Sequence, residues 1–223
     1  MVYCTKVTRP LLLHLLFVSG QCGNTYYLYL KNGMHQLILS NFAMHIKLDA
    51  EETEQVISKL QHKLIGKNSM LLNAGEICRN IYFVNKGCLR VFNTDAQGED
   101  HNILFCPENW WAADIASFSG RTASFYSIGA LEDTEMFYFS HNTLEQLYID
   151  VPKLERFFRI LTQNGFYLYQ RRVTSNLSKS AAERYEQFGN EYPGLEQRIA
   201  QKHIASYLGI TPVFLSMIRG KNT

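Results

Sequence analysis

The sequence has no apolar run long enough to cross a membrane and no strong charge of one sign. Of its 223 residues, 46% are hydrophobic and 19% are charged, which is typical of a globular protein. A membrane-spanning helix needs about 18 consecutive apolar residues, and no segment reaches that length. We therefore expect no membrane partner. The length allows one ordinary core and a smaller second one.

Clustered cysteines and histidines are also missing, which argues against a metal or redox site. None of the five cysteines lies two or three residues from another, so zinc-ribbon and iron–sulfur spacings are absent. A metal-dependent β-barrel enzyme needs clustered histidines with a carboxylate, whereas the seven histidines are dispersed. Neither a phosphate-binding glycine loop nor a nucleophile elbow occurs. We therefore expect no catalytic residues, no metal and no iron–sulfur cluster.

Residues 1–33 do not resemble the start of a folded domain. Basic residues precede an apolar run at 11–18, which resembles a weak secretory signal, but His14 interrupts the run. The alternative is a start codon placed too early, with Met34 or Met44 opening the domain. We favour this alternative because the sequence after Met34 is typical of a cytosolic protein. We predict a cytoplasmic protein and treat residues 1–33 as an extension outside the fold.

A short helix is predicted to begin after Asp49. Asp49 can cap its N-terminus, and the acidic residues that follow suit the positive end of the helix dipole. Val56, Leu60 and Leu64 follow at a spacing of four residues. We expect these three side chains to share one buried helix face.

The spacing changes to that of β-strands from about residue 68. The runs 81–84 and 88–92 flank Asn85-Lys86-Gly87, which predicts a β-hairpin. A second turn at 95–100 leads to a strand at 102–105, and further strands are predicted at 124–130 and 135–139. Several short strands with turn residues between them indicate a small barrel or jelly roll. We assign residues 34–150 to this sensor roll.

A long helix and a hinge are predicted over residues 151–176, with Pro152 in the first helical turn. A four-three-four-three spacing gives one side of a heptad seam, formed by Leu154, Phe158, Leu161, Gly165 and Leu168. The periodicity fits a helix packed on its own barrel equally well as a dimer helix that also contacts a partner. The polar segment 174–180 is a candidate hinge, and Ser180 with Glu183 forms a capping box for the next helix.

The strongest pattern lies at 199–219, inside a predicted DNA-binding domain at 177–223. A helix-turn-helix needs a small residue where its helices cross, a glycine opening the turn and buried aliphatic residues. Ala205 and Gly209 fill the first two roles, and Thr211-Pro212 marks the start of the second helix. The aliphatic residues are Ile204, Leu208, Ile210, Leu215 and Ile218. A helical hairpin without a DNA role would not need all these features in this order.

On these residues the chain resembles the CRP/FNR family of transcription regulators, from about Asp49 to Arg219. The matching segments are Ser180–Tyr185, Tyr192-Pro193 and Ile204–Arg219. The resemblance implies an α+β fold: a cyclic-nucleotide-binding-like β-roll (a jelly roll), a long dimerisation helix and a winged-helix-like helix-turn-helix domain. It also implies a homodimer that binds double-stranded DNA, with RNA polymerase as a further candidate partner.

The first departure from the family pattern concerns the effector. Members that bind cyclic AMP hold it with a Gly-Glu pair and an arginine about ten residues later. Ala113-Asp114 and Ser124 stand at those places here, and Ser124 offers no charge to a phosphate. Arg121, three positions away, is a weak substitute. We therefore expect a small-molecule effector other than cyclic AMP, in a pocket formed by Ala113, Asp114, Arg121, Thr122, Ala123 and Ser124.

The second departure lies in the recognition helix. Its outward residues near the N-terminal end should be Pro212, Val213, Ser216 and Met217, where related sequences usually carry Glu and Arg at the positions of Val213 and Met217. Valine and methionine offer bases only apolar contact, for example with a thymine methyl group. The polar residues are suited mostly to phosphates; they are Gln201, Lys202, His203, Thr211, Ser216, Arg219 and Lys221.

These departures predict weaker or altered sequence specificity. The net charge of +2 does not indicate nucleic acid by itself, so DNA binding would depend on a local basic surface. The alternative is a dimeric ligand-binding interaction module with a degenerate helix-turn-helix. Loss of affinity with added salt would distinguish a DNA reader from such a module.

Overall fold

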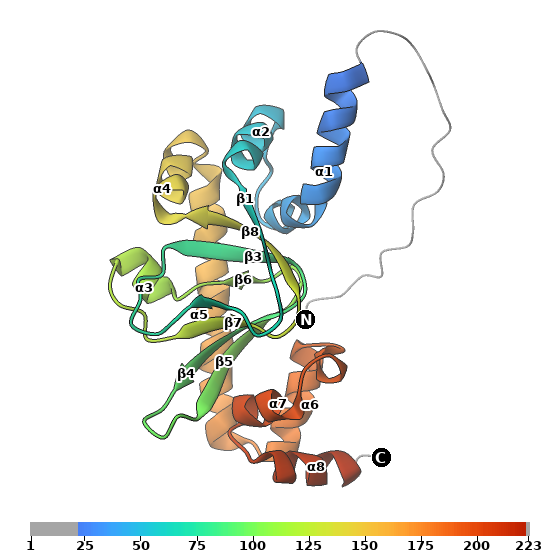
Figure 1. The fold of residues 1–223 in the computed structure, drawn as a ribbon, viewed down its shortest axis with the longest axis vertical. Helices are drawn as coiled ribbons and strands as arrows, with labels where there is room; N and C mark the ends of the chain where they lie inside the picture. Colours follow the sequence, from blue (N-terminus) through green and yellow to red (C-terminus); the bar gives the residue numbers. More distant parts are fainter. Residues whose placement is uncertain (1–21, 222–223) are drawn as a thin grey trace. The chain divides into compact units, whose positions relative to one another are not determined.

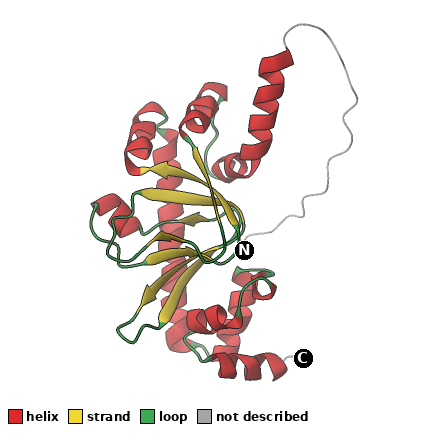
Figure 2. Cartoon of the chain, in the orientation of Figure 1, coloured by secondary structure: helices red, strands yellow, loops and turns green. Residues whose placement is uncertain are grey.

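The part of the sequence with the spacing of β-strands, residues 61–140, folds into two antiparallel four-stranded sheets. The computed structural model describes residues 22–221, and side chains from 33 to 220. The sheet orders are β1-β8-β3-β6 and β2-β7-β4-β5. The strands are β1 (Gln61–Ile65), β2 (Met70–Leu72), β3 (Asn80–Lys86), β4 (Leu89–Thr94), β5 (Asp100–Cys106), β6 (Trp111–Ala112), β7 (Ser127–Ala130) and β8 (Thr134–Ser140). Figure 2 shows these strands gathered between flanking helices.

The predicted hairpin between 81–84 and 88–92 is wrong, because these runs belong to different sheets. β3 pairs with β6 and β8, whereas β4 pairs with β5 and β7. Gly87 lies between them with a φ of +94°, and a Cβ there would lie 2.5 Å from the carbonyl oxygen of Asp133. A left-handed glycine is needed at this crossing just as in a hairpin turn, so the local sequence does not distinguish the two.

The second predicted turn does form a hairpin. Asn93 pairs with His101 and Thr94 with Asp100 across β4 and β5. Gly98 takes a φ of +84° in the connecting turn, and its N–H donates to the carbonyl of Asp95 at 3.0 Å. The β4–β5 hairpin therefore forms as the turn residues predict.

Helix α2 (Ala50–Lys59) begins as predicted and ends earlier than predicted. Asp49 and Glu52 form a complete capping box, and Val56 is fully buried. Leu60 leaves the helix with extended backbone angles, so Leu64 falls on β1 and is 68% exposed. The predicted common face of Val56, Leu60 and Leu64 is therefore wrong.

Helix α1 (Cys22–Ala43) spans the domain boundary expected at residue 33. Residues 1–21 of the predicted extension lie outside the described residues. The part from Gln36 onward belongs to the same compact unit as the roll. Phe42 is 1% exposed and its ring lies against Trp111 and Phe157, while Asn41 accepts the indole N–H of Trp111 at 2.9 Å. A domain opened at Met44 would lack these core groups.

The long helix α5 (Lys153–Ser178) follows the short α4 (His141–Asp150) and passes behind the roll in Figure 1. Leu154, Phe157 and Phe158 are buried in the roll's core. The helix continues through most of the polar segment 174–180, and the chain leaves helical geometry only at Lys179. The candidate hinge is thus narrower than predicted.

The C-terminal domain is helical throughout its described part. Its elements are α6 (Ala181–Glu191), the 3₁₀ turn η1 (Leu195–Gln197), α7 (Gln201–Leu208) and α8 (Pro212–Lys221). The Ser180–Glu183 capping box opens α6 as predicted. No strand occurs between residues 141 and 221. The described residues of this domain therefore include no β-strand wing. The fold is the predicted α+β arrangement of roll, long helix and C-terminal helices.

Candidate nucleic-acid interface and effector pocket

Helices α7 and α8 form the helix-turn-helix that the sequence predicts. Gly209 ends α7 with a φ of +65°, which suits a glycine C-cap. Thr211 accepts the backbone N–H of Phe214 at 3.2 Å and so caps α8. Ala205 and four of the five expected aliphatic residues are buried, while Ile210 is half-buried against the same core. The four are Ile204, Leu208, Leu215 and Ile218. Local capping and the buried aliphatic residues together set the turn between the helices.

The predicted DNA-contacting residues mostly lie at the surface. Val213 is 73% exposed and Met217 is 56% exposed, and these two residues lie one helical turn apart on α8. The other exposed members of the predicted set are Gln201, Lys202, Thr211, Pro212 and Ser216. His203 and Arg219 are half-buried, and the side chain of Lys221 lies outside the described ones. The outer surface of α8 is therefore open to a large partner.

The segment that contains α7 and α8 carries charged residues of one sign only. From residue 197 to residue 223 the sequence contains four basic residues and no acidic residue. The basic residues are Arg198, Lys202, Arg219 and Lys221. Arg198 is paired with Glu108 and Glu132 of the roll, which leaves the positive charges of Lys202, Arg219 and Lys221 in this segment. A local positive charge of this kind attracts a polyanion even though the whole chain is nearly neutral.

An aromatic cluster docks the C-terminal domain on the roll. Phe105 of β5 is fully buried, and its ring centroid lies 6.0 Å from Phe188, 5.7 Å from Tyr192 and 5.3 Å from Tyr207. Trp110 packs on Tyr192 from the roll side at 5.3 Å. This second core is shared by both domains, so α7 and α8 are held in one pose relative to β5.

Polar contacts between β5 and α7 complete the docking. Ser206 donates to the carbonyl of Asp100 at 2.5 Å and accepts the N–H of Asn102 at 2.9 Å. The Asn102 amide donates to the carbonyl of His203 at 3.1 Å. Arg172 of α5 donates to the carbonyls of Asn102 and Tyr207 at 2.9 and 2.8 Å, and also to Ile103. Three elements distant in sequence therefore meet at the N-terminal half of β5.

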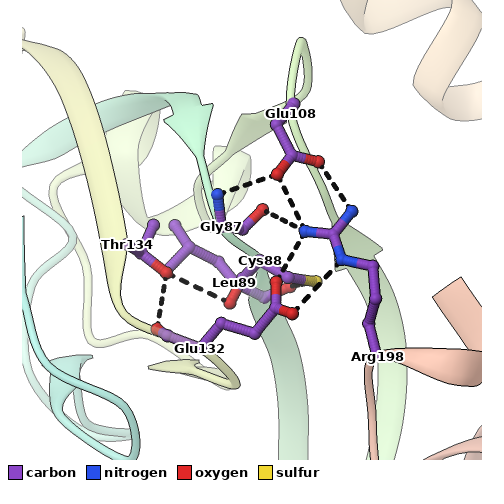
Figure 3. A network of polar contacts seen from close by, with 7 residues as sticks. All are labelled: Gly87, Cys88, Leu89, Glu108, Glu132, Thr134 and Arg198. Carbon is purple, nitrogen blue, oxygen red and sulfur yellow. Dashed lines mark hydrogen bonds and ion pairs between the residues drawn. The ribbon is translucent and has the colours of Figure 1, made fainter.

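Arg198 anchors the segment that precedes α7 (Figure 3). It donates two hydrogen bonds of 2.8 Å to Glu108, two of 3.2 and 2.6 Å to Glu132, and one of 3.4 Å to the carbonyl of Gly87. Glu108 also accepts the N–H of Gly87 at 2.9 Å. Partial burial acts to raise the pKa of Glu108, but the hydrogen bonds from Arg198 and Gly87 outweigh it and the pKa lies below its usual value. These ion pairs join the helix-turn-helix to the loops of the roll.

The imidazole of His203 is poorly placed to carry a charge. Burial against the roll is the main cause that lowers its pKa from 6.5 to about 4. The positive charges of Arg90, Lys202 and Lys67 add to this effect, and Asp100 opposes it. His203 is therefore neutral near pH 7, and it cannot serve as a cationic phosphate contact in this pose.

We expect acidification to weaken the docked state through His203. A depressed pKa contributes stability that is complete above pH 6.5 and is lost as the pH falls towards 4. Because the side chain is only half-buried, the loss should be about 1–2 kcal/mol. Urea unfolding at pH 7 and pH 4.5 measures it. His203→Gln cannot titrate and should lose less stability between these two pH values. Equal losses in both proteins would contradict the assignment.

Two of the predicted effector-pocket residues, Asp114 and Ser124, are buried and hydrogen-bonded to groups of the chain itself. Asp114 is 5% exposed and Ser124 is 4% exposed. One carboxylate oxygen of Asp114 accepts the N–H of Ser117 at 3.2 Å, and the other accepts the Ser124 hydroxyl at 2.7 Å and the Phe125 N–H at 3.2 Å. The donors that would hold a ligand anion here are thus occupied by the protein's own carboxylate.

The other predicted pocket residues are more accessible to solvent than Asp114 and Ser124. Arg121 is exposed and ends helix α3 (Ile115–Gly120) in the left-handed region with a φ of 55°. Thr122 and Ala123 are exposed, and Ala113 is half-buried. These residues do not reproduce the charged clamp that a cyclic phosphate would need.

The first part of the predicted seam of α5, from Leu154 to Leu161, packs on its own roll. Leu154 and Phe158 are buried in the roll's core, while Leu161, Gly165 and Leu168 are half-buried. Five large apolar side chains on α5 are exposed, and Tyr167 (56%) is one of them. The other four lie along one side of the helix and are Phe166 (59%), Tyr169 (40%), Val173 (59%) and Leu177 (85%). These four residues, separated by three, four and four positions, are called the α5 stripe below. They fit a second helix better than solvent.

Sequence reasoning missed three residues of the interdomain contact. Arg172 continues the heptad spacing, but its side chain is used within the chain. Ser206 and Arg198 carry no local signal, since their partners lie 104–106 and 66–111 positions away, respectively. Only the closing of the roll brings these groups together.

Comparison with known proteins agrees with this architecture. A family model described as the cyclic nucleotide-binding domain matches residues 63–150. No curated protein matches the chain by sequence. Within the described part of the chain, no helix is both long and apolar enough to cross a membrane.

Several solved structures share the fold at low identity. The c-di-GMP-responsive global regulator CLP of Xanthomonas campestris matches with a TM-score of 0.64 and 11% identity, covering 78% of this chain and 91% of that one. FixK2 from Bradyrhizobium japonicum has a TM-score of 0.63 and 17% identity, covering 73% and 83%. CooA from Carboxydothermus hydrogenoformans, solved as a mutant, has a TM-score of 0.60 and 15% identity, covering 79% and 85%. The match extends over the roll, the long helix and the C-terminal helices.

Proposed function

We propose that this chain is a cytoplasmic, dimeric transcription regulator of the CRP/FNR type that binds double-stranded DNA through α8. The observation that carries the proposal is the open outer surface of α8, with Val213 73% exposed, in a segment without acidic residues. The second helix of a helix-turn-helix enters the major groove with such a surface. We propose no catalytic role for the chain.

The α5 stripe supports the homodimer. Four exposed apolar side chains with near-heptad spacing are costly in water and are buried when two such helices pair. A two-fold dimer would present two copies of α8 to one face of DNA, and half-sites of an inverted repeat would match that symmetry.

The effector of the roll is proposed to be a small molecule other than cyclic AMP. The internal hydrogen bonds of Asp114 and the burial of Ser124 support this. A cyclic phosphate would have to displace these bonds without gaining a cationic partner, which costs free energy.

Selection from a random-sequence duplex pool at two salt concentrations tests the function. We expect an inverted repeat to be enriched, and the affinity for it to fall about tenfold or more between 50 and 200 mM salt as counterions are released. Cyclic AMP should leave the enriched sequence and affinity unchanged. Absence of enrichment together with absence of salt-dependent binding would reject the DNA-binding function and favour the interaction module.

A further inference from the structure

The outward side of α8 carries almost no hydrogen-bonding group. Val213, Ser216, Met217 and Gly220 share this side, because positions i, i+3, i+4 and i+7 of a helix lie in one row. Val213 and Met217 are 73% and 56% exposed. No atom lies within 4 Å of a Cβ built on Gly220. The row is therefore open and apolar, and the Ser216 hydroxyl is its single polar side-chain group.

Two polar side chains beside this row, those of Thr211 and Arg219, are engaged by the chain itself among the side chains that the structure describes. The Thr211 hydroxyl accepts the N–H of Phe214 at 3.2 Å, which directs it into the helix cap. Arg219 is half-buried and lies within electrostatic range of Tyr185 of α6. Neither side chain extends the outward row, so the row cannot supply the paired donors that recognise guanine.

Charge identifies DNA as the partner that fits this apolar row. The segment from 197 to 223 has basic residues and no acidic ones, and Gln201 and Lys202 are exposed at the start of α7. Basic and polar groups beside an apolar row match a major groove, where phosphates line the edges and base edges form the floor. A purely apolar protein surface would not use the flanking positive charge.

Among base edges in the major groove, only thymine presents an apolar group, its C5 methyl. A guanine or adenine edge placed under Val213 or Met217 would lose hydrogen bonds to water without replacement. We propose that Val213 and Met217 read thymine methyl groups, so that the operator carries A·T pairs beneath α8 and its recognition depends on the methyls. The proposal rests on the DNA-binding function and names the feature of DNA that is read.

The test uses the full chain and a duplex selected from the random pool, remade with deoxyuridine in place of thymidine. Uracil keeps the pairing and every hydrogen-bonding group but lacks the methyl. Each methyl buried on an apolar side chain should contribute roughly fourfold in affinity. With several such contacts in two half-sites, we expect the uracil duplex to bind at least about tenfold more weakly.

Two variants assign the effect to the side chains. Val213→Ser removes both methyl groups of the side chain and should reduce the thymine-to-uracil affinity ratio. Ser216→Ala, on the same row, should leave the ratio unchanged. Both sites are exposed, so folding is little affected, and circular dichroism checks it.

The outcomes separate the inference from the function on which it rests. Salt-dependent, sequence-selective binding that is equally tight to the uracil duplex would overturn the methyl reading and leave the regulator intact. Enriched sites with guanine beneath α8 would do the same. Absence of binding to either duplex would overturn the DNA-binding function itself.

Discussion

Replacing Phe105 by alanine is expected to separate the unfolding of the C-terminal helices from that of the roll. Phe105 is fully buried and belongs to the roll, while three of its ring partners belong to α6, α7 and the segment between them. Removing a buried phenylalanine ring costs about 3–5 kcal/mol. Most of this cost should fall on the docking of the two domains. Differential scanning calorimetry should show one transition for the wild type and two for Phe105→Ala.

Phe139→Ala is the matched control for this prediction. Phe139 is also fully buried, but it lies in the core of the roll with Trp111. Its loss should cost a similar amount and lower a single transition, because the docked helices lose their support together with the roll. A single lowered transition in Phe105→Ala as well would contradict the assignment of Phe105 to the docking contact.

Arg198→Ala should have a smaller effect on the same contact. Its side chain is 34% exposed, and those of Glu108 and Glu132 are 36% and 25% exposed. Ion pairs this accessible to solvent contribute about 1 kcal/mol or less each. The aromatic cluster therefore provides most of the docking energy. The Arg198 ion pairs mainly fix the position of the segment that precedes α7.

The double variant Phe166→Glu, Val173→Glu is expected to dissociate the proposed dimer. Both side chains are 59% exposed on the α5 stripe, so the monomer should fold unchanged. Pairing two such helices would bury four like charges, and we expect the dimer dissociation constant to rise at least about 100-fold, or roughly 2.7 kcal/mol. Sedimentation equilibrium measures the constant.

Asn164→Glu controls for the added charge. Asn164 is exposed on the opposite side of α5, so the same substitution there should leave the dissociation constant unchanged. Binding to an inverted repeat should weaken with loss of the dimer. A double variant that stays dimeric would show that the α5 stripe is not the dimer contact.

Several local elements were predictable because their hydrogen bonds join near neighbours. The capping boxes at Asp49–Glu52 and Ser180–Glu183 each close within three residues. The turn at Gly98 and the cap at Thr211 have the same short range. In these cases the residue types and their spacing contain the whole interaction.

The α5 stripe shows that the periodicity of apolar residues does not by itself predict which face of a helix is buried. A helix with apolar residues on two adjoining sides allows two seams of similar spacing, and periodicity does not say which one faces the roll. The roll buries the seam that begins at Leu154 and Phe158, which leaves Phe166, Val173 and Leu177 exposed. The choice depends on the shape of the surface against which α5 packs.

The sequence by itself determined the order of roll, long helix and helix-turn-helix, the starts of α2, α6 and α8, and the apolar character of the recognition helix α8. These features depend on local spacing, capping and turn residues. Only the tertiary structure decided that the chain passes from one sheet to the other at Gly87, and that Asp114 accepts hydrogen bonds from Ser124 and Phe125. It also decided that Arg198 and Ser206 join the two domains. The partners in these contacts lie 10 to 111 positions apart, and such contacts exist only once two sheets and a helix domain have closed on one another.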